Sequence, residues 1–94
     1  MYMLRIEHLV PDYERWKKAF DSDPADREKS GVRRYQVLRS VENPNYVLID
    51  LEFDTQAQAE ALLAAMQRIW GQVQGTLMTS PQAKIVELVE TKEY

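Results

Sequence analysis

The sequence predicts one α+β domain with the element order strand, helix, strand, strand, helix, strand. Apolar residues alternate with polar ones at 2–10 and 46–53, which is typical of strands. Apolar residues spaced three and four apart after Thr55 indicate a long helix, and a proline turn at 42–45 indicates a hairpin. The length of 94 residues fits a single domain spanning 1–94.

The first strand and the first helix are predicted over residues 2–20. One face of the strand carries Leu4, Ile6, His8 and Val10. Pro11 has no N–H to donate and ends the strand, and Asp12 is expected to cap the helix that follows. The apolar face of this helix consists of Tyr13, Trp16 and Phe20, and we assign Trp16 and Phe20 to the core.

A short helix is expected between the first helix and the second strand. Asp23-Pro24 combines an N-cap residue with proline at the first helical position. Ser30-Gly31 would end this helix, because glycine readily takes the left-handed conformation found after helix C-termini.

Residues 32–41 and 46–53 are predicted to form a hairpin around Glu42-Asn43-Pro44-Asn45, since proline flanked by asparagine favours a tight turn. The second strand of the hairpin carries Val47, Ile49, Leu51 and Phe53 on one face, and Tyr46, Leu48, Asp50 and Glu52 on the other.

The longest helix is expected to begin after Asp54-Thr55, with a capping box formed by Thr55 and Gln58. Its apolar stripe consists of Ala59, Leu62, Met66, Ile69 and Val73. Gly71 and Gly75 predict that it ends or bends near Trp70. Ser80-Pro81 predicts a loop, residues 83–91 a last strand, and residues 92–94 a polar tail.

This order of elements corresponds to the split βαβ, or ferredoxin-like, arrangement: a four-stranded antiparallel sheet with both helices on one face. The other face of the sheet would be bare. A wide apolar face is unfavourable in water, so we expect a second copy of the chain to cover it and form a homodimer.

Composition excludes several functions. The net charge is −3, and Arg33, Arg34 and Arg39 form too small a basic group to bind nucleic acid. No segment approaches the roughly 20 apolar residues that cross a membrane, and no targeting segment is recognisable, which predicts a cytoplasmic protein. One histidine and no cysteine exclude a conventional zinc site, so we expect neither a metal nor a cofactor.

Two segments resemble a known family. Residues 8–20, HLVPDYERWKKAF, are similar to the first strand and helix of small proteins of the dimeric α/β-barrel superfamily, the relatives of the antibiotic biosynthesis monooxygenases. Residues 43–53, NPNYVLIDLEF, are similar to the second and third strands of the same group. The resemblance implies a dimeric barrel, in a superfamily with many different activities.

Two features of the family are missing from this chain. Quinone-oxidising members carry an Asn and a Trp on the second helix; Trp70 could stand in for the Trp, but no Asn precedes it at 62–66. Haem-degrading members have a histidine on or after that helix, where this chain has none.

His8 is the candidate general base because it is the only histidine. If the first and third strands lie side by side and parallel, Asp50 would sit at a similar height and orient it. In the alternative, His8 is a core residue facing the helices, since it alternates with Leu4 and Ile6, and Asp50 pairs with Arg5 or Arg39.

Trp70 and Tyr46 are candidate walls of a binding cavity for a flat aromatic molecule. In the alternative, Trp70 only covers the core at the end of its helix, and Tyr46 only shields the hairpin.

These candidates lead to three hypotheses. The first is a small-molecule-binding dimeric barrel, which could act as a cofactor-independent monooxygenase on an aromatic or polyketide-like substrate in a cavity between two sheets. There His8 would remove a proton so that the substrate anion reacts with O₂. The second is a non-catalytic ligand-binding or assembly domain of the same fold. The third is haem binding through His8.

Overall fold

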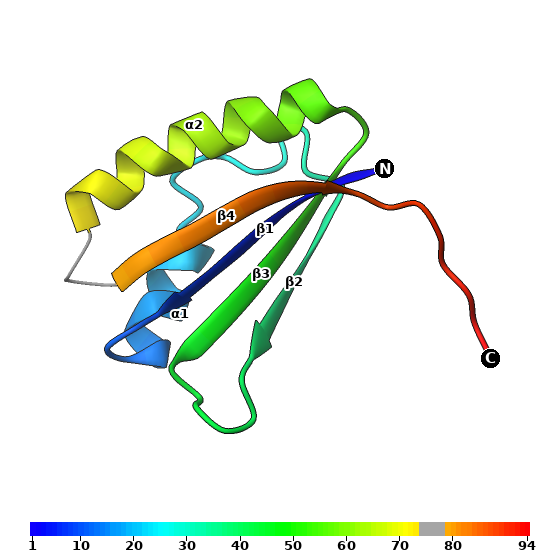
Figure 1. The fold of residues 1–94 in the computed structure, drawn as a ribbon. Coiled ribbons are helices and arrows are strands. Elements are labelled where there is room, and N and C mark those ends of the chain that lie inside the picture. The colour runs from blue at the N-terminus through cyan, green and yellow to red at the C-terminus, as the bar shows by residue number, and fades with distance from the viewer. Residues whose placement is uncertain (74–78) are drawn as a thin grey trace.

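The computed structural model describes residues 1–73 and 79–94, and it has the predicted architecture (Figure 1). The elements are β1 (Tyr2–Leu9), α1 (Tyr13–Asp21), β2 (Arg34–Arg39), β3 (Tyr46–Phe53), α2 (Gln56–Val73) and β4 (Thr79–Glu87). The strands form one antiparallel sheet in the order β2-β3-β1-β4. The predicted ferredoxin-like fold is therefore confirmed. Gly75, one of the two predicted helix breakers, lies outside the described residues.

Both predicted helix caps are present. The Asp12 carboxylate accepts a hydrogen bond from the Glu14 N–H at 3.0 Å, at the start of α1. At the start of α2, the Gln58 N–H donates to Thr55 Oγ1 and the Thr55 N–H donates to Gln58 Oε1, both at 3.2 Å. Each bond satisfies a backbone N–H that would otherwise lack a partner at a helix N-terminus.

The predicted short helix over 23–31 is wrong. Residues 22–33, which we call the connecting loop, form a series of turns. Asp23 and Asp26 have φ values of 54° and 51°, which a right-handed helix cannot accommodate. The Asp23 carboxylate accepts the Arg27 N–H at 2.9 Å, so the side chain competes with the helical pattern of backbone bonds.

The C-terminal third also differs from the prediction. The α2 helix continues to Val73 and includes Gly71, because one glycine in a helix costs only about 1 kcal/mol. The last strand runs from Thr79 to Glu87 and passes through Pro81, where a loop was expected. Pro81 is tolerated because β4 is an edge strand and its pairing with β1 shifts register between Glu7 and Leu9.

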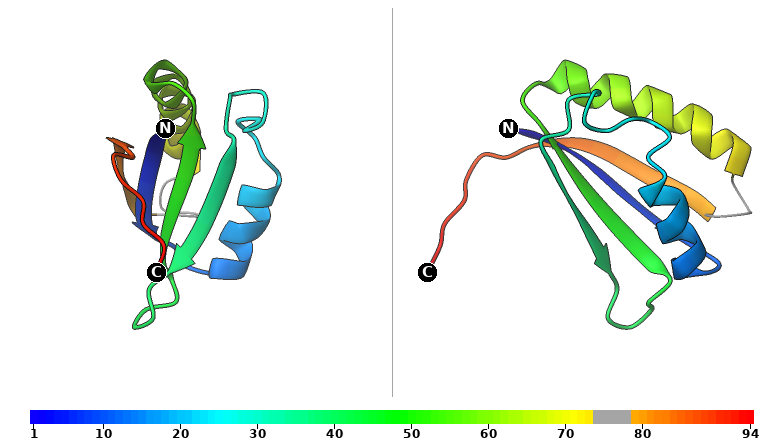
Figure 2. Two further views of the ribbon diagram at one scale, coloured as in Figure 1. Left: turned by 90° about the vertical axis from the view of Figure 1, so that its right-hand side faces the viewer. Right: turned by 180° about the vertical axis from the view of Figure 1, so that it is seen from behind.

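The hydrophobic core lies between the sheet and the two helices, which cover the same face (Figure 2). The α2 helix packs on β1, β3 and β4, and α1 contributes a row of aromatic rings in which Trp16 stacks on Phe20 and Tyr13 lies tilted against Trp16. The core residues from the sheet are Leu4, Ile6, Val47, Ile49, Leu51 and Phe53. Trp16 and Phe20 belong to this core, which confirms their assignment.

The opposite face of the sheet, which we call the open face, carries no helix. Two arginine–carboxylate pairs lie on it, Arg5 with Asp50 and Arg34 with Glu52. Between and beside them are the apolar side chains of Met3, Leu9, Leu38, Leu48 and Val86. The residues after β4 run away from the body of the domain (Figure 1). In the described part of the chain, no helix is both long enough and apolar enough to span a membrane.

Candidate functional site

His8 faces the helices, in agreement with the core alternative. Its side chain belongs to the same face of β1 as Leu4 and Ile6, and only 2% of the residue is exposed. The imidazole meets the Trp16 ring of α1 edge to face, with 5.6 Å between the ring centroids. Periodicity in β1 was therefore a correct guide to its orientation.

The expected pairing of His8 with Asp50 is wrong. The strands β1 and β3 are neighbours but antiparallel, and the Cα partner of His8 is Val47, whereas that of Asp50 is Arg5. Directly paired residues of adjacent strands lie on the same face of a sheet, and faces alternate along each strand. His8 and Asp50 therefore lie on opposite faces, and the carboxylate cannot orient the imidazole.

Asp50 forms an ion pair with Arg5 on the open face, as the alternative predicted. Arg5 Nε and Nη2 donate to the two carboxylate oxygens at 2.9 and 3.1 Å, a bidentate arrangement. Arg39, the other candidate partner, instead lies over the ring of Tyr13, 4.2 Å from its centroid. Asp50 thus completes a polar contact of the sheet surface.

Tyr46 lies on the open face as well. Its hydroxyl donates a hydrogen bond to Glu7 Oε1, and this bond raises the pKa of Tyr46. Tyr46 is thus separated from His8 by the thickness of the sheet and does not share a cavity with it.

A cavity of about 330 Å³ lies between the sheet and the two helices. His8 and Ile49 of the sheet line it, together with side chains of both helices and of the connecting loop. The helices contribute Trp16, Ala19, Phe20, Met66, Ile69, Trp70 and Gln72, and the loop contributes Ser22, Pro24, Ala25 and Arg27. The cavity therefore brings His8 and Trp70 together, on the helix side of the sheet and not between two sheets as expected.

Neither ring nitrogen of His8 has a hydrogen-bond partner among the described residues. Burial disfavours the charged imidazolium and lowers the pKa of His8 below its ordinary value of 6.5. A contact of the imidazole with the backbone of Leu9, whose geometry falls short of a hydrogen bond, offsets this only in part. The imidazole is consequently neutral near pH 7. One ring nitrogen can then donate a hydrogen bond and the other can accept one.

Several of the residues that line this cavity were not identified in the sequence analysis. Met66 and Ile69 were recognised only as part of the apolar stripe of α2. The loop residues, Arg27 above all, had no recognisable signal, because they reach the cavity through turns with positive φ angles that the pattern did not predict.

Comparisons with solved structures show the fold. SnoaB, a cofactor-independent oxygenase from Streptomyces nogalater, superposes with a TM-score of 0.74 at 12% identity, covering 96% of this chain and 93% of that one. A candidate antibiotic biosynthesis monooxygenase from Bordetella bronchiseptica gives 0.71 at 18% identity, covering 95% and 98%. A similar candidate from Nitrosomonas europaea gives 0.69 at 18% identity, covering 90% and 86%.

No protein-family model matches the sequence, and no curated protein matches it either. The chain therefore shares the fold of the antibiotic biosynthesis monooxygenase structures at low identity, which confirms the resemblance at the level of architecture. Identity of 12–18% leaves the activity to be argued from the site.

Proposed function

We propose that the protein binds a flat aromatic small molecule in the cavity between its sheet and helices. The observation that carries the proposal is His8, a buried and neutral imidazole with both nitrogens unpartnered in the described structure. A buried polar group without a partner is costly, and a ligand that bonds to it would remove that cost. The ring walls formed by Trp16, Phe20 and Trp70 suit an aromatic ligand.

We further propose that this binding supports cofactor-independent oxygenation, the chemistry named for SnoaB, which has the same fold. His8 would accept a proton from an acidic C–H of the substrate, and the resulting carbanion would transfer an electron to O₂. Recombination of the two radicals gives a peroxide anion, which takes the proton back from protonated His8 to form a hydroperoxide. The hydroperoxide loses water to leave a ketone, so one oxygen atom enters the product and the other leaves as water, and His8 is neutral again. Neutral His8 in an apolar cavity can fill the role of the base.

The test uses anthrone, a tricyclic ketone whose central CH₂ is acidic. Mixed with the protein in air-saturated buffer, it should give anthraquinone faster than in buffer alone, with one O₂ consumed per product formed. The variant His8→Phe keeps an aromatic ring of similar size but has no base, so it should bind anthrone without accelerating the reaction. Equal rates for the two proteins would contradict the role of His8.

The two alternatives give different results in the same preparation. Quenching of tryptophan fluorescence by anthrone without turnover would support a non-catalytic binding domain, since Trp16 and Trp70 line the cavity. Haem binding through His8 predicts a Soret band on titration with hemin that is absent in His8→Phe. No spectral change in the wild type would remove the haem hypothesis.

We also propose that two copies pair through their open faces to complete a barrel. The open face combines apolar side chains with partly buried ion pairs, which is typical of a surface that another protein covers.

A further inference from the structure

Arg27 occupies a position in the cavity lining that the proposed role of His8 does not explain. It lines the cavity of His8, and it also lines an open groove on the outer side of the connecting loop, beside Arg33, Arg34 and Asp54. Among the described residues, it is the only one that belongs to both linings. It is also the only residue with a formal charge near pH 7 in the described lining of the cavity.

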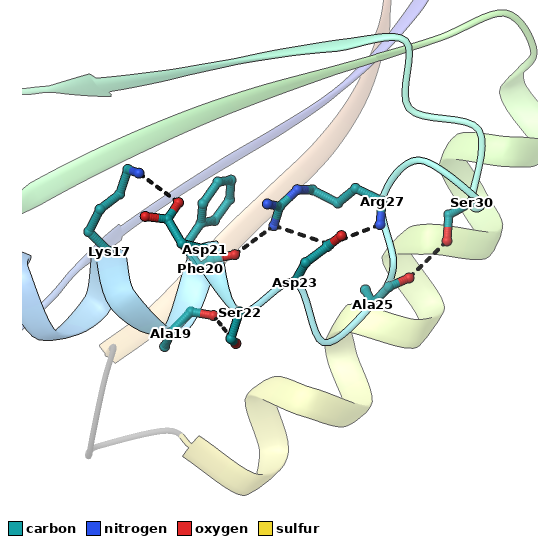
Figure 3. Close-up of polar contacts among 9 residues, drawn as sticks. All are labelled: Lys17, Ala19, Phe20, Asp21, Ser22, Asp23, Ala25, Arg27 and Ser30. Carbon is teal, nitrogen blue, oxygen red and sulfur yellow. Dashed lines mark hydrogen bonds and ion pairs between the residues drawn. The ribbon is translucent and has the colours of Figure 1, made fainter.

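The side chain of Arg27 is held in a defined place. Its guanidinium lies over the ring of Phe20, 3.9 Å from the centroid, and 5.1 Å from the centroid of Tyr35. Its Nη1 donates to the Phe20 carbonyl at the end of α1 at 2.9 Å (Figure 3). Only 12% of the side chain is exposed, so the cation is largely removed from water.

The polar contacts of this cation are incomplete. Its contacts with described residues use Nη1 alone, which also lies 3.5 Å from Asp23 Oδ1. A guanidinium has five N–H donors, so those on Nε and Nη2 remain for another acceptor. Asp23 Oδ1 already accepts the Arg27 backbone N–H and its side chain is 35% exposed, so the ion pair is weak.

We propose that Arg27 determines specificity by binding an acidic group of the ligand, a carboxylate or a phenolate, at the edge of the cavity. This inference rests on the proposed function, because it concerns the ligand of the same cavity. The aromatic rings hold the flat body of the ligand, neutral His8 bonds to it inside the cavity, and Arg27 offers a planar donor set to its anionic end. A ligand with a cationic group would meet the like charge of Arg27 in a largely desolvated place.

A purely structural role for Arg27 makes a different prediction. By donating to a carbonyl at the C-terminal end of α1 and stacking on Phe20, Arg27 also stabilises the helix end. Its replacement would then change stability while leaving the choice among ligands unchanged. The ratio of two affinities measured on one protein separates the two roles.

The experiment measures binding of three naphthalene probes by tryptophan fluorescence and calorimetry near neutral pH. The probes share one ring system and differ in charge: 2-naphthoate, 2-naphthalenemethanol and 2-naphthylmethylammonium. The wild type should bind the carboxylate with an affinity at least about tenfold higher than that for the alcohol, and it should bind the ammonium most weakly. This comparison needs no variant, so it decides the point even if a substitution impairs folding.

Variants then assign the preference to Arg27. In Arg27→Met the carboxylate should lose its advantage while the alcohol binds within about threefold of its wild-type affinity. Arg27→Lys, which keeps the charge but not the planar donors, should retain part of the advantage. Arg33→Met is the matched control, because Arg33 lines only the outer groove and its side chain is 66% exposed, and it should change nothing.

Each outcome decides a separate point. Equal wild-type affinity for carboxylate and alcohol, or a preference that survives in Arg27→Met, would overturn the role of Arg27 while the binding cavity stands. Failure of all three probes to bind would overturn the proposed function and this inference with it.

Discussion

At the scale of single residues, His8 shows how burial changes chemistry without a charged partner. The apolar surroundings lower the pKa of His8 relative to the ordinary value of 6.5 that it has in the unfolded chain. At pH values between the lowered pKa of the folded state and 6.5, the unfolded chain binds more protons than the folded chain. The free energy of unfolding therefore rises with pH in that window.

This sign gives a prediction for His8→Phe. The contribution of neutral His8 to the free energy of unfolding is fully present above pH 6.5. It is lost as the pH falls through 6.5 toward the lowered pKa of the folded state. Urea unfolding at about pH 7.5 and about pH 5.5 should show that the wild type loses more stability on acidification than His8→Phe. The chain has no other histidine, and every other titratable group is present in both proteins, so the contributions of those groups cancel in the comparison.

The comparison uses the difference between the stabilities measured at the two pH values for each protein. This difference cancels the effect of the new ring on packing. Equal losses in wild type and variant would mean that His8 stays accessible to protons in the folded state. The cavity would then be wetter than the buried geometry indicates.

At the scale of elements, Gly31 couples the end of the connecting loop to the start of α2. Its φ is +100°, a value that residues with a Cβ rarely adopt. A Cβ at this position would also come within 2.7 Å of Gln58 Nε2 and 2.8 Å of Gln58 Cδ. Gln58 is the second member of the capping box of α2, so the two elements share one side chain.

We therefore expect Gly31→Ala to lower the free energy of unfolding by about 1–3 kcal/mol, through backbone strain and displacement of Gln58. Gly71→Ala is the matched control. Gly71 lies inside α2, and outside its chain neighbours and the backbone of its own helix no described atom lies within 4 Å of the place that an alanine methyl group would take. The same substitution should therefore stabilise the protein by about 0.5–1 kcal/mol. Denaturant unfolding of both variants measures the two changes in stability. Changes of the same sign in the two variants would contradict the prediction.

At the scale of the whole molecule, the open face decides the oligomeric state. Leu48 lies near its middle, between Glu7 of β1 and Leu38 of β2 in the register of the sheet. Light scattering at micromolar concentration should give about twice the 11.0 kDa mass of one chain. Leu48→Arg should shift the mass toward that of a monomer, because an unpaired charge would be buried in the interface.

Val41→Arg provides the control for charge and size. Val41 is fully exposed in the hairpin turn between β2 and β3, outside the paired residues of the sheet, and this variant should remain a dimer. A monomeric wild type would contradict the proposed barrel, whereas a dimer that survives Leu48→Arg would place the interface elsewhere.

The sequence by itself determined the features that depend on neighbouring residues. Period-two and helical patterns gave the order of the main elements, and the caps at Asp12 and Thr55 follow from side chains within three positions of the N–H groups that they satisfy. The same periodicity indicated that His8 faces the helices. The failure at 23–31 came from two aspartates with positive φ angles, which composition does not distinguish from a helix start.

Only the tertiary structure decided which distant side chains meet. The antiparallel register of β1 and β3 separates His8 from Asp50 and pairs Asp50 with Arg5, and no local pattern specifies that register. The cavity likewise forms where two helices and the connecting loop converge on the sheet, which places Arg27 beside rings from other elements. Local sequence sets the elements because their bonds are local, whereas the site depends on long-range packing.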